Sequence, residues 1–359
     1  MGGNIYPHSP KHCPFCIRQF GSFLKTLMDD NKKKATSGAP AVDTRIKALV
    51  LPNIHVDSSN PTFPIWSDFM SLDSNGGEDS GRRELLREAV ERGCPKLQHI
   101  ECSWFADDDD VEVAINALTE GCKTWGLKSF YAMYLNDLDY YHRSRSILET
   151  LLMHHSGTLE EIELKECEIV VSDDLMFLFS NCKNLKRVKI EPSDSGEAVI
   201  CFNEVVSEWV CRDLKELHLV LSRPRILSLY EPTEWLETQV RRMGKSVYGQ
   251  IGRLVRLEIL SLAFDEGEYP NAQTKEFEYD LTRERGWLAE LAGLKELRHF
   301  DAATDFWSRM GQGEVEFMDA QWPKLEKMTF KVFSLEIIMK EPHWQWLQKR
   351  RPNLKFSAY

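Results

Sequence analysis

The chain has 359 residues, more than one ordinary globular core, so its length predicts either two domains or an array of repeats. Its formal net charge of -11 argues against non-specific binding to nucleic acid or to an acidic membrane, because Lys and Arg supply that affinity. With no apolar run near the roughly 18 residues of a membrane span, and no secretory signal, we expect an intracellular protein in the cytoplasm or the nucleus.

Residues 1–43 are expected to form a leader, a short helix at residues 17–28 and a linker, ahead of a main domain of residues 44–359. The leader contains Cys13 and Cys16 as a single Cys-x-x-Cys pair. A structural zinc site usually takes a second pair of ligands, and a redox pair needs a preceding strand, which this proline-rich stretch does not favour. We therefore favour a poorly ordered leader over a zinc or thiol-redox site.

Strand-like segments precede the centre of the chain at residues 46–51, 97–102 and 127–132. The Gly-, Ser- and Pro-rich residues 52–82 predict a loop or an insertion. The spacing of apolar residues predicts helices at residues 84–92, 111–119 and 144–155. The run from Asp107 to Asp110 lacks the spacing of a calcium loop, so we expect it to cap the second of these helices.

The centre of the chain repeats one pattern, Leu-x-x-aliphatic-x-aliphatic, at residues 159–164, 185–190 and 214–219. As a strand, each copy directs its fourth and sixth positions inward and its third and fifth outward. Between copies we expect an amphipathic helical segment that ends in Cys182 or Cys211. A strand and a helix of fewer than about thirty residues cannot bury their own apolar face, so neighbouring repeats must stack.

The pattern continues at residues 257–262, 297–302 and 325–330, with a truncated copy at residues 354–356. From Leu97 onward the leading leucines are 26 to 32 residues apart, except for intervals of 43 and 40 residues, where we expect insertions at residues 223–250 and 266–285. The ninth position is Cys, Ser or Asp in five of eight copies, as the turn of such arrays favours. The expected fold is α/β, a leucine-rich repeat solenoid (horseshoe) with parallel strands on the concave face and helices on the convex face.

The nine cysteines are odd in number, and several fall at one repeat position, so we expect reduced structural thiols rather than disulfides. Two of them open the phrases Cys94-Pro-Lys-Leu97 and Cys182-Lys-Asn-Leu185, which resemble the cysteine-containing leucine-rich repeats of the ribonuclease-inhibitor-like class. The long irregular repeats, closed by Trp or Cys as in Trp209-Val-Cys211 and Trp322-Pro-Lys-Leu325, look most like the repeat regions of fungal F-box proteins.

This resemblance spans residues 46–356. It implies a substrate receptor of a cullin-RING ubiquitin ligase, in which the repeats hold the target and an F-box docks the adaptor. An F-box is not evident in this sequence, so a stand-alone repeat protein without a ligase role is the alternative.

Binding is expected on the concave face, which exposes the third, fifth and seventh positions of each copy. Six carboxylates and five Lys or Arg share the positions compared, which predicts a surface of mixed charge. The candidate contact residues on this face are Tyr131, Glu161, Glu163, Arg187, Lys189, Glu216, His218, His299 and Asp301. Residues just after the strands belong to types that dominate interface energies, and they are expected either to form a binding rim or to fill the space beneath the loops. These are Trp104, Tyr134, Phe306, Trp307 and Arg309.

The sequence predicts a protein-binding scaffold rather than an enzyme, because it contains no Gly-rich phosphate loop and no recognisable nucleophile elbow. We expect no cofactor and no metal. The expected partner is a protein, with a ubiquitin-ligase adaptor as a second partner if an F-box lies upstream. Neither nucleic acid nor a membrane is an expected partner, and the chain is expected to be a monomer.

Overall fold

The structure is a computed structural model that describes residues 48–51, 98–103, 126–133, 147–165, 172–191, 200–201, 207–222, 244–264, 287–302, 310–330 and 335–358. These residues belong to two compact units, Met1–Leu127 and Lys128–Tyr359, and each is described by itself. Predictions for other parts of the chain lie outside the described residues. They include the leader with Cys13 and Cys16, the linker, the domain boundary after residue 43, the helices at residues 84–92 and 111–119, and the insertion at residues 266–285.

The first unit contains two parallel strands, β1 (Ala48–Leu51) and β2 (His99–Ser103). Leu49 lies opposite Ile100, and Leu51 lies opposite Cys102. These residues occupy the fourth and sixth positions of two successive copies of the repeat. The first two predicted strands and their pairing are therefore confirmed.

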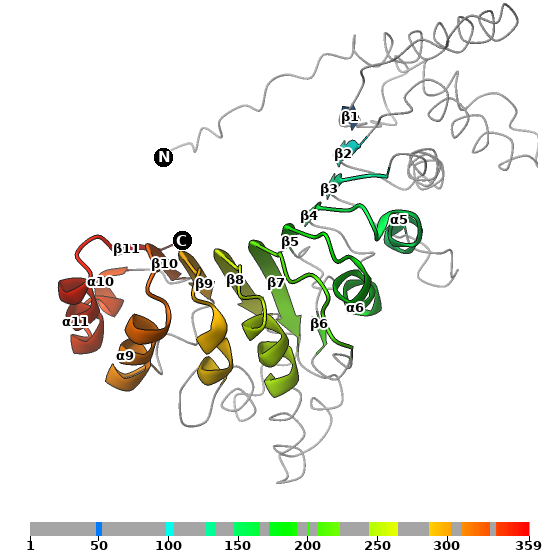
Figure 1. The fold of residues 1–359 in the computed structure, drawn as a ribbon. Helices are drawn as coiled ribbons and strands as arrows, with labels where there is room; N and C mark the ends of the chain where they lie inside the picture. The colour runs from blue at the N-terminus through cyan, green and yellow to red at the C-terminus, as the bar shows by residue number, and fades with distance from the viewer. Residues whose placement is uncertain are drawn as a thin grey trace, which may run out of the picture. The chain divides into compact units, whose positions relative to one another are not determined.

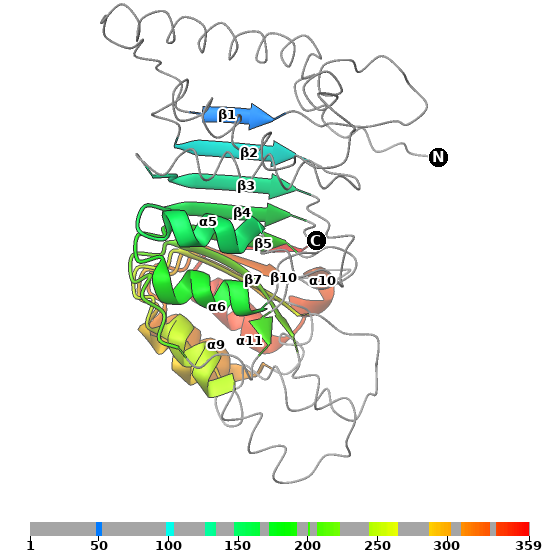
Figure 2. The same cartoon turned by 90° about the vertical axis from the view of Figure 1, so that its right-hand side faces the viewer.

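The second unit contains a parallel sheet whose strands follow one another in sequence order, as Figures 1 and 2 show. They are β3 (Ser129–Met133), β4 (Glu161–Lys165), β5 (Arg187–Glu191), β7 (Glu216–Ser222), β8 (Ile259–Phe264), β9 (His299–Ala302), β10 (Lys327–Phe330) and β11 (Lys355–Ala358). The short β6 (Ile200–Cys201) lies off this row and pairs with the end of β7. From β3 to β10 each strand begins two residues after the predicted leading leucine.

The strands align so that every fourth position of the repeat lies beside the fourth position of its neighbours. Ile162 is opposite Phe130 and Val188, and Leu260 is opposite Leu217 and Phe300. All six of these side chains are buried, with exposed fractions of 0% or 1%. The alternation of the strand sends the same row of residues into the core from every repeat, so the apolar surface becomes continuous.

Helical segments connect the strands and cover one face of the sheet, and none of the described helices of the second unit lies on the other face (Figure 1). They are α5 (Ile147–His155), α6 (Ser172–Asn181), residues 244–252, the 3₁₀ helix η3 (Leu288–Gly293), α9 (Gln312–Gln321), α10 (Leu335–Ile338) and α11 (Pro342–Arg350). The strands lie along an arc with these helices on its outer side (Figure 1). The fold is therefore a leucine-rich repeat solenoid with the strands on its concave face.

Three of the turns that lead into a strand are closed by the same backbone hydrogen bond. The leading leucine donates its N–H to the carbonyl three residues earlier: Leu185 to Cys182 at 3.3 Å, Leu214 to Cys211 at 3.2 Å and Leu325 to Trp322 at 3.2 Å. The residue that supplies the carbonyl is fully buried in all three repeats. Cys and Trp suit this position because neither carries a charge into the core.

Cys182 and Cys211 are free thiols, as predicted for structural cysteines. Burial raises the pKa of each to about 12, because a thiolate would lose its hydration in the apolar core. Both therefore act as small apolar residues at neutral pH.

Three local details differ from the sequence prediction. In its described residues, the connection from β5 to β7 contains the strand β6 and no helix. Residues 244–250, expected within an insertion, are helical and bury Val247 and Tyr248. The last repeat is one residue shorter before its strand, so Phe356 lies opposite Met328 at a fourth position and Lys355 takes the outward third position.

Candidate protein-binding face

The concave face of the second unit is built from the third and fifth positions of the repeat. From β3 to β11 the third positions are Ser129, Glu161, Arg187, Glu216, Ile259, His299, Lys327 and Lys355, and the fifth positions are Tyr131, Glu163, Lys189, His218, Ser261, Asp301, Thr329 and Ser357. The seventh positions of β4 and β5 add Lys165 and Glu191. Neighbouring members of a row come from adjacent strands, about 4.8 Å apart, so residues distant in sequence become side-chain neighbours.

Glu163 is the centre of an ionic network over β4, β5 and β7. Its carboxylate oxygens lie 2.9 Å from Nη2 of Arg187, 3.3 Å from Nζ of Lys165 and 4.0 Å from Nζ of Lys189. The carboxylate is largely buried, with 11% of its side chain exposed. A carboxylate removed from water in this way needs opposite charges close by, and three different positions of the repeat supply them.

The network extends from Glu163 toward both sides. Lys165 lies 3.6 Å from Glu191, and Lys189 lies 3.7 Å from Glu216, whose Oε1 is 3.0 Å from Nε2 of His218. Cations and carboxylates alternate along this path, so most charged side chains of this half of the face are paired with an opposite charge on the same face.

The titration of the network follows from burial and neighbouring charge. Burial opposes the charged form of Lys165, but the nearby Glu191 and Glu163 outweigh it and raise the pKa of Lys165. For His218 burial wins, and its pKa is lowered although Glu216 acts in the opposite direction. His218 is therefore mainly neutral at pH 7 and shares a hydrogen bond, not a full ion pair, with Glu216.

The other half of the face, over β8 to β11, is polar but contains few ion pairs. The Ser261 hydroxyl donates to Oδ2 of Asp301 at 3.0 Å. A separate chain joins Nε2 of His299 to Oγ1 of Thr329 at 2.9 Å and Oγ1 of Thr329 to Oγ of Ser357 at 3.1 Å. Ile259 lies between the two halves in the row of third positions.

Burial, and then the positive charge of Lys327, lower the pKa of His299. The ring of His299 is consequently mainly neutral at pH 7. It can then donate from one nitrogen and accept at the other.

The sequence-predicted candidates Tyr131, Glu161, Glu163, Arg187, Lys189, Glu216, His218, His299 and Asp301 all occupy this face. The predicted rim residues Trp104, Tyr134, Phe306, Trp307 and Arg309 lie outside the described residues. Sequence reasoning missed Ile259, Ser261, Lys355 and Ser357. The first two occupy third and fifth positions of a copy that had been recognised, so applying the pattern to every copy would have found them.

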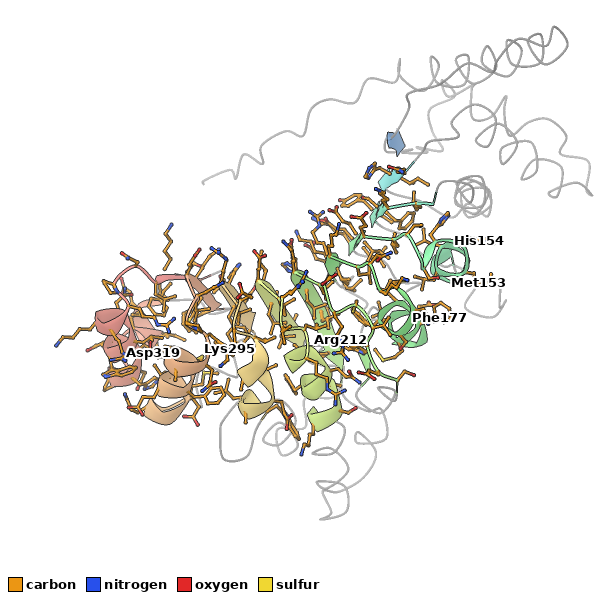
Figure 3. The ribbon with its side chains drawn as sticks, viewed as in Figure 1. Met153, His154, Phe177, Arg212, Lys295 and Asp319 are labelled. Atoms are coloured by element: carbon orange, nitrogen blue, oxygen red, sulfur yellow. The ribbon has the colours of Figure 1, made fainter. Side chains whose placement is uncertain are left out.

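The convex side presents a different surface. Met153 and Phe177 are 42% and 44% exposed and point away from α5 and α6 on that side (Figure 3). In the described part of the chain, no group of three or more His, Cys, Asp or Glu is placed to hold a metal ion. No helix in that part is long and apolar enough to cross a membrane.

The fold and this face define the class of protein, a leucine-rich repeat solenoid with an open, polar strand face. No family model matches the sequence, and no curated protein matches it. Among solved structures, the leucine-rich repeat-containing protein LegL7 from Legionella pneumophila is similar at 13% sequence identity and a TM-score of 0.33, over 82% of this chain and 97% of that chain. A TM-score of 0.33 does not establish a shared fold, so the class is inferred from the strand register described above.

Proposed function

We propose that this protein is a non-enzymatic scaffold that binds a protein partner on the concave face of its repeats. The observation that carries the proposal is the common register of the strands. It gathers charged, hydroxyl and aromatic side chains onto one face that none of the described helices of the second unit covers. A face of mixed charge suits a protein surface, which offers both signs of charge, better than a uniform polyanion.

The ionic network supports binding rather than catalysis. Glu163 is held by Arg187, Lys165 and Lys189, and His218 is hydrogen-bonded to Glu216. Groups paired in this way present a fixed pattern of charge, which favours recognition of one partner over others.

The proposal can be tested by comparing two triple variants in affinity capture from cells that express the protein. The face variant is Tyr131→Ala, Glu161→Ala and Lys189→Ala, and the matched convex variant is Phe177→Ala, Glu316→Ala and Lys349→Ala. Each removes one aromatic, one acidic and one basic side chain. The face variant should lose about 90% or more of the specifically captured protein, since truncations at hot spots cost ~2 kcal/mol or more.

Circular dichroism and thermal unfolding of both variants would show whether the repeats remain folded. Equal capture by the face variant and the unmodified protein would reject the concave face as the binding surface. Loss of capture by the convex variant alone would move the binding surface to the helices.

A narrower role as the substrate receptor of a cullin-RING ubiquitin ligase rests on the resemblance of Cys94-Pro-Lys-Leu97 and the Trp- or Cys-closed repeats to F-box proteins. This role predicts co-purification of the ligase adaptor. The face variant should retain the adaptor and lose the target, because an F-box and the repeats bind different proteins. Target capture without any adaptor would support a stand-alone scaffold instead.

A further inference from the structure

The last strands of the sheet expose two lysines that form no ion pair with the described carboxylates. Lys327 and Lys355 face each other in the parallel pairing of β10 and β11, at the outward third position of each strand. Neither lies within ion-pair distance of a carboxylate among the described residues. Elsewhere in the same row Arg187 and Glu216 are paired with neighbours on the face. The concave face therefore has excess positive charge at this end, although the whole chain is acidic.

Hydroxyl groups lie beside these lysines and form an ordered hydrogen-bonded chain. His299, Thr329 and Ser357 are joined through contacts of 2.9 Å and 3.1 Å. If His299 donates from Nε2, the hydroxyl proton of Ser357 is left to point outward. If the hydrogen bonds run in the opposite direction, from Ser357 through Thr329 to Nε2 of His299, then Nδ1 of His299 carries the ring proton instead. In either arrangement one donor remains at an end of the chain for an acceptor outside the protein.

The neighbouring carboxylates offset only part of this positive charge. Asp301 lies diagonal to Lys327 and keeps its negative charge while it accepts from Ser261, so the two lysines exceed it by one charge. Glu326 lies at the second position of its repeat, where it is paired with Arg298 at 2.7 Å. A cation that is not held in an ion pair keeps more of its interaction energy available for a partner than one held in a network.

We propose that the surface formed by His299, Lys327, Thr329, Lys355 and Ser357, here called the basic end, binds a carboxylate-rich segment of the protein partner. This proposal rests on the proposed function of the concave face and names the chemistry that the face recognises. Carboxylates of the partner pair with Lys327 and Lys355, and the hydroxyl chain donates to one of their oxygens.

The geometry favours an extended segment that crosses the strands. Lys327 and Lys355 are separated by one strand spacing of about 4.8 Å, and alternate side chains of an extended peptide are about 6.8 Å apart. The flexible lysine side chains can cover this difference. The matching sequence has Glu or Asp at alternate positions, and Ile259 beside His299 offers an apolar contact at one end.

The direct test uses fluorescence anisotropy with a short labelled peptide of alternating Glu and Gly, and the same peptide with Gln in place of Glu. The unmodified full-length protein should bind the Glu peptide, and binding should weaken as salt is added. Lys327→Glu with Lys355→Glu should weaken binding by about tenfold or more, because two attractive contacts become repulsive. Lys327→Arg with Lys355→Arg should retain it.

A charge-matched control is Lys183→Glu with Lys349→Glu, two exposed lysines that are not part of the concave face. The control should bind within about twofold of the unmodified protein, since neither lysine is part of the basic end and added salt screens exposed charges. Equal losses in the two Glu variants would overturn the proposal, because only the net charge of the chain would then matter. Equal affinity for the Glu and Gln peptides would also overturn it.

The outcomes separate this inference from the proposed function. In one outcome the triple face variant loses its partner, while the variant with Lys327→Glu and Lys355→Glu keeps the partner and binds the Glu peptide as tightly as the unmodified protein. In that case the scaffold role stands and the basic end is rejected. If peptide binding depends on these lysines while capture is unaffected by the triple face variant, the basic end stands and the wider concave-face role fails.

Discussion

A single glycine shows how closely the repeats approach each other on the convex side. A Cβ atom added to Gly252 would lie 1.8 Å from the carbonyl oxygen of Glu290 in the next repeat, far inside van der Waals contact. Only a residue without a side chain allows the backbones of residues 244–252 and η3 to pack at this distance.

Gly252→Ala should therefore destabilise the protein by about 1–3 kcal/mol, the usual cost of forcing extra atoms into a packed interior. Gly157→Ala is the matched control, because nothing lies within 4 Å of its added Cβ. Urea unfolding followed by circular dichroism would measure both. Equal stability of the two variants would show that the backbone at Gly252 moves without cost.

Cys182 and Cys211 give a second prediction at this scale. Their pKa values of about 12 and their full burial mean that almost no reactive thiolate is exposed at pH 8. Both should resist iodoacetamide in the folded protein and react once urea has unfolded it, which peptide mass spectrometry can follow at each cysteine separately. Rapid modification of either in the native state would contradict the packing of these turns.

The neutral histidines of the concave face predict a dependence of stability on pH. The pKa of His218 and of His299 is lowered from its ordinary value of 6.5, mainly by burial. Below about pH 6.5 the unfolded chain therefore binds more protons than the folded chain. As the pH decreases in this range, the free energy of unfolding decreases as well. The slope from each proton is at most about 1.4 kcal/mol per pH unit.

Urea unfolding at about pH 7.5 and at about pH 5.5 should show this loss of stability, because these two pH values bracket the usual titration range of histidine. A variant with His218→Gln and His299→Gln should lose less stability between the two pH values than the unmodified protein. The same loss in both proteins would assign the effect to other groups.

At the scale of elements, α9 and α11 are held together by one carboxylate. Asp319 of α9 accepts hydrogen bonds from Nε of Arg350 and, at 2.5 Å, from Nε of Arg351, which also donates to the carbonyl of Trp322 at 2.8 Å. Burial opposes the charge of Asp319, but these hydrogen bonds outweigh it and lower the pKa of the carboxyl. Removing the carboxylate would leave Arg351 half-buried with fewer partners.

Asp319→Ala should cost about 1.5–3 kcal/mol of unfolding free energy, the range for hydrogen bonds to charged groups. Asp213→Ala is the control, because Asp213 and Arg256 form an ion pair of 2.9 Å in which both side chains are more than half exposed. That pair should contribute only about 0–1 kcal/mol. A smaller loss for Asp319→Ala than for Asp213→Ala would refute the assigned role of Asp319.

The strands could be predicted from sequence because two constraints agree in each of them. A leading leucine fixes the turn, and the fourth and sixth positions, such as Ile162 and Leu164, alternate with charged residues. The connections were less predictable. Trp209-Val-Cys211 closes a repeat as expected, but the strand β6 before it was not predicted. Its pairing with the end of β7 depends on tertiary context, which local apolar periodicity does not reveal.

The candidate face was predictable as a set of positions, but its internal chemistry was not. Outward positions follow directly from the strand period, so Glu163 and Arg187 could be placed there. Which charges pair depends on the lateral neighbours created by the register, including the diagonal contact of Arg187 and the directly opposite contact of Lys189 with Glu163. Likewise, Lys355 entered the basic end only because its repeat is one residue short.

Considered as a whole unit, the repeats are joined by a regular main-chain pattern. The carbonyl of Glu160 accepts the N–H groups of both Lys186 and Arg187, and that of Lys186 accepts those of both Lys215 and Glu216. The pattern is local, because each repeat bonds to the one before it and the one after it. Stability in such an array is transmitted from neighbour to neighbour and is lowest at the ends.

Amide hydrogen exchange should follow this arrangement. The central strands β5, β7 and β8 each have a partner on both sides, whereas β11 pairs only with β10 among the described residues. Exchange measured by mass spectrometry should be slowest in the central strands and faster in β11. Uniform exchange across β5 to β11 would instead show that the second unit opens in one cooperative step.

The unequal lengths of the repeats have a consequence for how such a protein can change over time. The register from β7 to β8 is kept across leading leucines 43 residues apart, just as it is from β4 to β5 across 26. The connecting chain can therefore gain or lose residues without shifting the side chains presented on the concave face. Point substitutions at the outward strand positions and insertions in the connections can accumulate independently in descendants of this gene.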